Sequence, residues 1–421
     1  MRKLVAVATV LVAALALTVP GAIGGPGQTP GVTAKTIVIG GTFPLTGPAA
    51  AYAPIPVGMK AYFSYINARR AAKTDDPARR RGVFGRQIVW KYYDDAYNPA
   101  NTVQLTRRLV EQDKVFATVG QLGTEHNLAV RGYLNQVKVP QSLVSTGASA
   151  WGTQGKEYPW TIGWQPDYIS EGRLYGLHIK QNFNGKKIAV LYQNDDYGKD
   201  YLLGLRSALG KSYADANIVA QEPYEATATS VASQFVRIKA SGATILVLLS
   251  TPGATIRAYA TGKALGYNPE QIYLNSVSAT AAFLNTAVAS AGAAYVNGSL
   301  STSYLKDPAN PEWDNDAAMK QYRQIMAKYA PSANANNGLY YYGVAKAEAF
   351  VQALYKAGKN PTRASYMAAL LSMNTPNKFA LPGVLEKTSK TDRFIISQQQ
   401  LIRYTNPDWK RIGKLVEGRP R

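Results

Sequence analysis

The sequence predicts an α/β protein with two Rossmann-like lobes, each built on a parallel-core sheet and joined by a hinge of several strands. Short apolar strands alternate with amphipathic helices, which is the pattern of βαβ units and parallel sheets. The alternation pauses at the proline-flanked segment 158–166 and then begins again. The length of 421 residues also exceeds the size at which a single hydrophobic core stops growing.

The first half of the chain opens with a segment rich in Gly, Pro and Thr and then enters the alternating pattern. A helix is expected from about Pro54 to Ala68. Another begins at Asn98, because its side chain can cap free amides and the following Pro99 suits the first helical position. The strands expected in this half are 36–40, 87–93, 114–120 and 142–145.

The second half repeats this rhythm, and its helix–strand pair at 230–250 resembles the pair at 101–120. An extended stretch at 293–303 is expected to carry the chain back toward the first lobe. Helices dominate 311–372, and a last strand is expected at 394–402, before a basic tail. The other strands expected in this half are 187–192, 218–221, 244–249 and 271–274.

The predicted organisation starts with a secretory signal peptide, because Arg2 and Lys3 precede an apolar run that is too short to span a membrane. We therefore expect an extracytoplasmic protein, in a periplasm, at the cell surface or secreted. The predicted divisions are the signal peptide 1–24, a flexible lead-in 25–34, lobe 1 at 35–162 and 303–382, lobe 2 at 163–302 and 383–411, and a tail 412–421.

The composition argues against several kinds of site and partner. The chain has no cysteine, which excludes disulfides, thiolate metal sites and a lipid-bearing cysteine. Two histidines without metal-ligand spacing predict no metal site and no cofactor. The net charge of +21 is scattered, except for runs at 69–70 and 79–81 that flank an expected exposed loop. We expect a solvated basic surface and no nucleic acid partner, with attraction to anionic polymers, lipid headgroups or acidic ligands as the alternative.

Small polar or aromatic residues follow the ends of several predicted strands. In an open α/β sheet, ligands bind outside the carboxyl ends of the strands, so these side chains are expected to meet at one site. None of them has the surroundings of a nucleophile, and no nucleophile-elbow pattern is complete. The pattern predicts a protein that holds a molecule and is not an enzyme. The residues are Tyr52, Thr124, Ser149, Tyr197, Thr251 and Ser276.

The chain resembles the extracytoplasmic solute-binding proteins of ABC importers, in particular the leucine/isoleucine/valine-binding group of type I periplasmic binding proteins. This resemblance implies a monomer that captures a branched-chain amino acid or related small polar organic solute by lobe closure and delivers it to a membrane permease. A ligand-sensing receptor-type domain and a binder of aromatic carboxylates or amides are the alternatives. The segments that carry the resemblance are 39–48, 92–99, 120–124, 145–149 and 195–198.

The resemblance assigns roles to the loops that follow the strands of the first lobe. Thr124 matches a hydroxyl residue that holds the ligand carboxylate together with its backbone amide, as a helix N-terminus can. Ser149 matches a second hydroxyl of the clamp, and Gly147 a carbonyl that faces the ligand ammonium. Ala148 belongs to the same expected ligand loop.

Tyr52 and Tyr197 match aromatic walls that close from opposite lobes, and Thr251 stands where relatives often carry an aromatic residue. One departure concerns 275–278, which includes Ser276 and has no carboxylate where amino-acid binders of this group place the partner of the ligand ammonium. A buried ammonium without a counter-charge is costly. Either another acid takes this role or the ligand has no α-amino group. The candidate acids are Glu125, Asp195 and Asp196.

Overall fold

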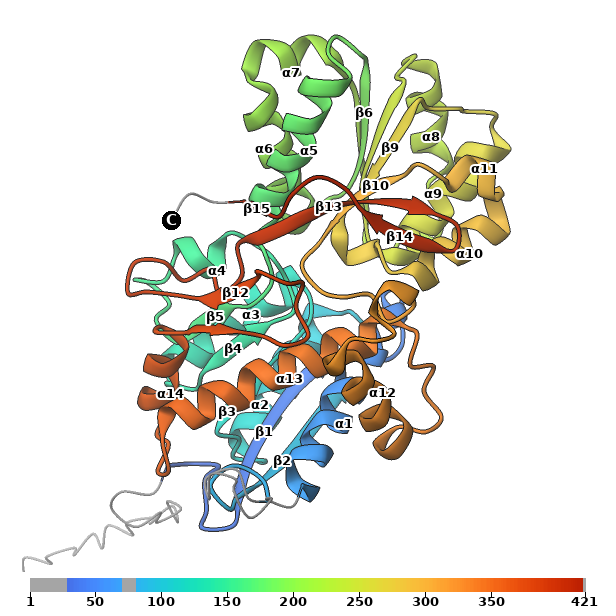
Figure 1. Cartoon of the computed structure of the whole chain (residues 1–421). Helices are drawn as coiled ribbons and strands as arrows, with labels where there is room; N and C mark the ends of the chain where they lie inside the picture. Colours follow the sequence, from blue (N-terminus) through green and yellow to red (C-terminus); the bar gives the residue numbers. More distant parts are fainter. Residues whose placement is uncertain (1–28, 70–80, 419–421) are drawn as a thin grey trace, which may run out of the picture.

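The computed structural model describes residues 29–69 and 81–418 (Figure 1). The predicted signal peptide and most of the basic loop before residue 81 lie outside the described residues. The two sheets belong to two lobes, drawn one above the other in Figure 1, with β13 in red near the level where they meet. No helix in the described ranges is both long and apolar enough to cross a membrane.

The first sheet is entirely parallel, with the strand order β2-β1-β3-β4-β5. Its strands are β1 (Thr36–Phe43), β2 (Gln87–Asp94), β3 (Ala117–Val119), β4 (Gln141–Val144) and β5 (Thr161–Gly163). The helices of this lobe are α1 (Pro54–Ala68), α2 (Pro99–Glu111), α3 (Thr124–Gln136), α4 (Ala150–Thr153), α12 (Ala317–Tyr329), α13 (Gly338–Ala357) and α14 (Arg363–Leu370), with the 3-10 turn η1 (Ala50–Tyr52).

The second sheet is mixed, with the order β14-β13-β10-β9-β8-β6-β7, and β15 pairs with β13. Its parallel strands are β6 (Ile188–Gln193), β7 (Ile218–Tyr224), β8 (Ile245–Leu249), β9 (Gln271–Leu274) and β10 (Leu300–Ser303). Its antiparallel strands are β13 (Gln398–Thr405), β14 (Asp408–Arg411) and β15 (Val416–Glu417). The helices are α5 (Tyr168–Asn182), α6 (Asp196–Leu209), α7 (Lys211–Asn217), α8 (Ala232–Ala240), α9 (Pro252–Ala264), α10 (Ala281–Ala291) and α11 (Ala293–Val296).

The connections between the sheets follow β5, follow β10 and precede β13. They include the 3-10 turn η4 (Pro311–Trp313) near the cleft and a small hairpin of β11 (Asn374–Pro376) and β12 (Leu385–Lys387). Another 3-10 turn, η3 (Ser276–Ser278), follows β9 within the second lobe. The predicted fold class is therefore confirmed. The residue boundaries given to the lobes stay a prediction. The predicted cap of α2 is confirmed, because the Asn98 side chain accepts a hydrogen bond from Ala100 N at 2.9 Å.

Two predicted elements differ from the structure. The stretch 293–303 is extended only at its end, because Ala293–Val296 forms α11 and buries Val296. The last strand begins at Gln398, later than predicted, and a further strand follows it at 408–411. Ile395 and Ile396 are fully buried just before that strand. Their apolar pattern is like that of a strand, which explains why the predicted strand started too early.

Helices α1 and α13 pack at unusually close range, and this packing positions one wall of the cleft. A Cβ on Gly58 would lie 2.2 Å from Tyr340 O, and a Cβ on Gly343 would lie 2.2 Å from Ile55 O. Only glycine permits such an approach of two helix backbones. The residues that follow Gly343 on α13 are consequently held deep against the first sheet.

Candidate ligand-binding site

A cavity of about 140 Å³ lies between the lobes, at the carboxyl ends of the strands of both sheets. An engineered protein cavity of roughly 150 Å³ accommodates benzene, so this space suits a small organic molecule. Several predicted site residues line it together, from segments that are far apart in the sequence. They are Tyr52, Thr124, Tyr197, Thr251 and Ser276.

The expected ligand loop after β4 contributes a different residue to this cavity. Ser145 lines it, whereas Gly147 and Ala148 line a second, much smaller cavity beside Trp151. The Gly147 carbonyl accepts a hydrogen bond from Tyr168 N at 2.8 Å, so it is already engaged. The role that the resemblance implies for Gly147 and Ala148 thus has no geometric support at the main cavity.

Ser149 contacts the opposite lobe. Its backbone amide donates to Asp200 Oδ2 at 2.7 Å, and its hydroxyl donates to Asp200 Oδ1 at 3.2 Å. A second contact across the cleft joins Asp196 N to the Glu125 carboxylate at 3.2 Å. The lobes therefore touch in this structure, which is a closed arrangement around the cavity.

The N-terminus of α3 presents free hydrogen-bond donors to the cavity. The first amide of this helix with a backbone partner is that of Asn127, which donates to Gly123 O at 3.1 Å. The amides of Thr124, Glu125 and His126 precede it, and nothing within the described residues accepts from them. Gly123 and Thr124 both line the cavity. Unpaired amides and the positive end of a helix dipole together favour a bound anion.

Buried and partly buried tyrosines form much of the wall. Burial raises the pKa of each of these phenols above its ordinary value, so they stay protonated and can act as hydrogen-bond donors. Tyr168 and Tyr197 meet edge to face with ring centroids 5.1 Å apart. The residues in this group are Tyr52, Tyr97, Tyr168, Tyr197 and Tyr342.

The hydroxyl residues on the second lobe are already hydrogen-bonded. Ser276 donates through its amide to Glu171 Oε1 at 2.6 Å and through its hydroxyl to Glu171 Oε2 at 2.7 Å. Tyr175 and Tyr201 also donate to this buried carboxylate. Glu171 therefore lies beside the segment that lacks an acid in the sequence, yet it does not line the cavity. No signal in the sequence separates this residue from other glutamates on helix faces.

None of the acids proposed as partners of a ligand ammonium lines the cavity. Asp195 caps α6 and accepts from Gln193 Nε2 at 2.6 Å, and burial raises the pKa of its carboxyl group. Among the described residues that line the cavity, Asp307 is the acidic one, and it accepts from Ala309 N at 2.9 Å. Lys306 and Arg411 line the same part of the cavity.

Lys346 is a further residue that the sequence reasoning missed. It lies on α13, is completely buried, and donates to Ser145 Oγ at 2.5 Å and to Tyr342 Oη at 2.7 Å. Both acceptors line the cavity. A lysine between apolar residues on a helix normally lies on the exposed face, so the sequence contains no signal for this burial.

A family model with the description periplasmic binding protein matches residues 36–401. Among curated proteins, an amino acid binding protein of Pseudomonas aeruginosa is 25% identical over 130 residues, or 31% of this chain. That match spans 34% of the relative, about a third of its length.

Solved structures are similar in fold at low sequence identity. A fatty acid ABC transporter substrate-binding protein from Thermomonospora curvata has a TM-score of 0.76 and 20% identity, covering 93% of this chain and 94% of that one. A branched chain amino acid ABC transporter protein from Thermus thermophilus with bound valine has a TM-score of 0.74 and 16% identity, covering 91% and 96%. At these identities the likeness is one of fold.

Proposed function

Since the chain belongs to the periplasmic binding protein family, we propose that it captures a small organic carboxylate between its lobes and delivers it to the permease of an ABC transporter. The observation that carries this proposal is the cavity, which both lobes line and which is bordered by Gly123 and Thr124 at the start of α3, where backbone amides are free. We further propose that the protein acts as an extracytoplasmic monomer, exported by the predicted signal peptide, and that it binds its ligand without chemical change.

The geometry supports separate roles for the residues that would contact the carboxylate and those that would contact the rest of the ligand. The amides at the start of α3 and the Thr124 hydroxyl receive the carboxylate, because donors at a helix N-terminus favour negative charge. The tyrosines on both lobes enclose the rest of the ligand. Contacts across the cleft, such as the one between Ser149 and Asp200, stabilise the closed form around it. Hinge closure of two lobes around a ligand is a common capture mechanism.

The relatives support transport as the role and leave the ligand open. One is named as an amino acid binding protein, one as a branched chain amino acid transporter and one as a fatty acid transporter component. A second candidate is therefore an elongated carboxylate with an apolar tail. Apolar and indole side chains that could contact such a tail line the cavity, together with the charged residues Lys306, Asp307 and Arg411. The apolar and indole residues are Leu305, Leu339, Leu381, Ile402, Trp313 and Trp409.

A thermal-shift screen of the mature, refolded protein tests the proposal. The panel contains leucine, valine, phenylalanine, benzoate, 3-phenylpropanoate, short and medium fatty acids, and the corresponding amides. A ligand at about 100 times its dissociation constant adds roughly 2.7 kcal/mol to the free energy of unfolding, which a melting curve detects. Stabilisation by one or more of the carboxylates supports the proposal, whereas a folded, ligand-free protein that no compound stabilises contradicts it.

A further inference from the structure

Lys346 places a buried amino group directly behind the wall of the cavity. Its Nζ donates to Ser145 and Tyr342, and it lies 5.3 Å from the ring centroid of Trp164. Its stem packs against the backbone at Gly120, where an added Cβ would come within 3.1 Å of Lys346 Cδ. The amino group of Lys346 is therefore part of the wall and has no exposed surface.

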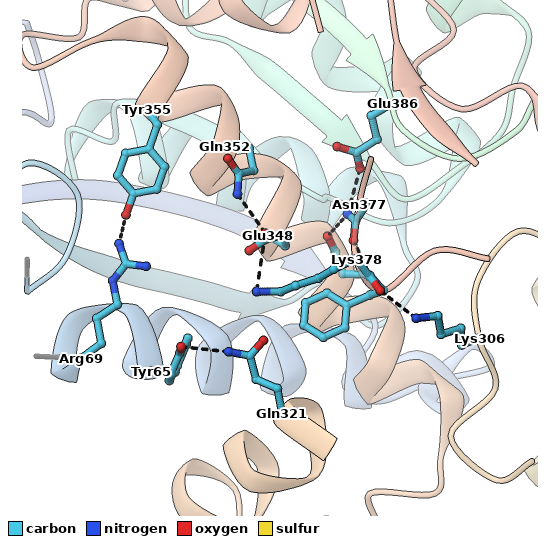
Figure 2. Close-up of polar contacts among 12 residues, drawn as sticks. Tyr65, Arg69, Lys306, Gln321, Glu348, Gln352, Tyr355, Asn377, Lys378 and Glu386 are labelled. Carbon is cyan, nitrogen blue, oxygen red and sulfur yellow. Dashed lines mark hydrogen bonds and ion pairs between the residues drawn. The ribbon is translucent and has the colours of Figure 1, made fainter. Parts of the chain in front are cut away.

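The carboxylates of the neighbouring elements are engaged elsewhere (Figure 2). Glu348, on the same helix, accepts from Gln352 Nε2 at 2.9 Å and lies 3.8 Å from Lys378 Nζ. Glu386, on β12, accepts from Trp164 Nε1 at 2.7 Å and from Asn377 Nδ2 at 2.9 Å. In the part of the chain that the structure describes, no ion pair involves Lys346.

A buried ammonium without a counter-charge is costly, so burial lowers the pKa of Lys346 well below its ordinary value. Lys346 therefore holds its proton most firmly when an anion lies nearby. The titratable groups that face it are Tyr342 on its own helix and, beyond Trp164, Glu386 on β12. Neither supplies a negative charge within ion-pair distance. An anion in the cavity, on the other side of Ser145 and Tyr342, would supply one.

The hydrogen bonds around Lys346 fix the orientation of a polar side chain at the cavity. Since the lysine donates to both hydroxyls, Ser145 donates onward to Gly120 O at 2.7 Å and Tyr342 donates to Gln165 Oε1 at 2.7 Å. The Gln165 side chain, which lines the cavity, is thereby oriented with its NH₂ group toward Tyr168, 3.5 Å from Tyr168 Oη. The free amides at the start of α3 are further donors beside this cavity.

We propose that Lys346 sets the ligand class of the cleft, which takes an organic carboxylate whose α-carbon carries no ammonium group. This inference rests on the proposed function and makes it more specific. An α-ammonium next to the bound carboxylate would meet the positive field of Lys346. The acid that lines the cavity, Asp307, lies instead beside Asn310 and Trp313, next to the start of α10.

Matched pairs of probes test this selectivity by isothermal titration calorimetry. Leucine is compared with 4-methylpentanoate, and phenylalanine with 3-phenylpropanoate, because each pair differs only in the α-amino group. The wild-type protein is expected to bind at least one of these acids about tenfold or more tightly than its amino-acid counterpart. Lys346→Met is expected to weaken binding of that acid by about tenfold or more and to reduce the ratio within the pair.

Lys378→Met is the control, because it removes the same charge from the half-exposed Lys378, which pairs with Glu348. This variant is expected to keep both the affinity and the ratio. An unchanged ratio in Lys346→Met would overturn the inference. So would a wild-type protein that prefers the amino acids, although the proposed transport function would then stand.

A different outcome would contradict the proposed function itself. In that case the wild-type protein would bind neither the acid nor the amino acid of either pair, and no compound in the thermal-shift screen would stabilise it. If Lys346→Met does not fold, the wild-type protein still decides the question through a neutral isostere. It is expected to bind 4-methylpentanoate or 3-phenylpropanoate about tenfold or more tightly than the corresponding primary amide. Equal affinity for acid and amide would overturn the role of Lys346.

Discussion

Thr124 combines two ways of holding an anion, a hydroxyl group and the backbone amides that begin α3. The hydroxyl lies 2.6 Å from Thr146 Oγ1, which fixes its position at the cavity. Thr124→Val keeps the shape of the side chain and the amides but removes the hydroxyl. Because hydrogen bonds to charged groups contribute roughly 1.5–3 kcal/mol, we expect carboxylate affinity to fall by about tenfold or more, measured by calorimetry.

The matched control is Thr255→Val, since the Thr255 hydroxyl is equally buried but bonds to Ser250 within the second lobe, at 2.7 Å. It does not line the cavity, so carboxylate affinity is expected to stay at the wild-type value. Equal affinities of the two variants would remove Thr124 from the proposed carboxylate site.

Glu386 makes the stability of the fold depend on pH. Burial raises the pKa of its carboxyl group to about 7, although Asn377 and Trp164 both donate to it. A carboxyl group with a raised pKa in the folded state stabilises the fold fully below its ordinary pKa. This contribution disappears as the pH rises through about 7. The total change is roughly 3 kcal/mol, since one pKa unit corresponds to about 1.4 kcal/mol.

Glu386→Gln is expected to remove this dependence, because the amide oxygen can still accept both hydrogen bonds and carries no charge. Urea unfolding at about pH 5 and about pH 8 measures it. The variant is expected to match the wild type at the lower pH and to exceed its free energy of unfolding at the higher pH. A wild type and variant that lose equal stability between the two conditions would show that another group is responsible.

The close contact of α1 and α13 supports the wall that contains Tyr342 and Lys346. Gly343→Ala would bring a methyl group to 2.2 Å from Ile55 O, so the helices must separate. We expect the free energy of unfolding to fall by about 1–3 kcal/mol, measured by chemical denaturation. Ligand affinity is expected to fall as well, because the separation displaces residues on the same helix.

Gly132→Ala is the control for this substitution. Gly132 also lies inside a helix, α3, but nothing lies within 4 Å of an added Cβ there. Alanine is the better helix former, so this variant is expected to gain up to about 1 kcal/mol. If both variants were stabilised, the close packing of α1 and α13 would not be rigid.

The whole molecule is closed in this structure, and the bond between Ser149 and Asp200 is one of the contacts that close it. Asp200→Ala removes both hydrogen bonds that Ser149 donates. A closed state that loses contacts is less populated, so the ligand-free variant is expected to have a larger radius of gyration in solution scattering. Saturating ligand should restore the wild-type radius of gyration. The affinity of the variant for the ligand should be a few-fold lower, because part of the binding free energy is used to close the lobes.

Asp215→Ala serves as the control, because Asp215 pairs with Arg206 and Lys211 within the second lobe. It removes a carboxylate of the same kind without changing a contact between lobes. The radius of gyration of this variant should equal that of the wild type. An equal radius for all three ligand-free proteins would mean that other contacts control closure.

The sequence by itself determined the fold class, most strands, the cap of α2 and the end of the sheets at which the cavity lies. These follow from local patterns, because periodicity and capping are properties of neighbouring residues. The sequence also predicted that Tyr52, Thr124, Tyr197, Thr251 and Ser276 lie at one site, since parallel strands end at one edge of a sheet. Their contacts with a ligand stay a prediction.

Only the tertiary structure decided that Ser145 lines the main cavity while Ser149 bonds to Asp200 in the other lobe. Lys346 is nearly half the chain away from Ser145, and its burial depends on the close packing of α13 against α1. No local pattern encodes such a contact, because a lysine acquires its environment from the elements that pack around it. The charge of the site is therefore a property of the assembled fold.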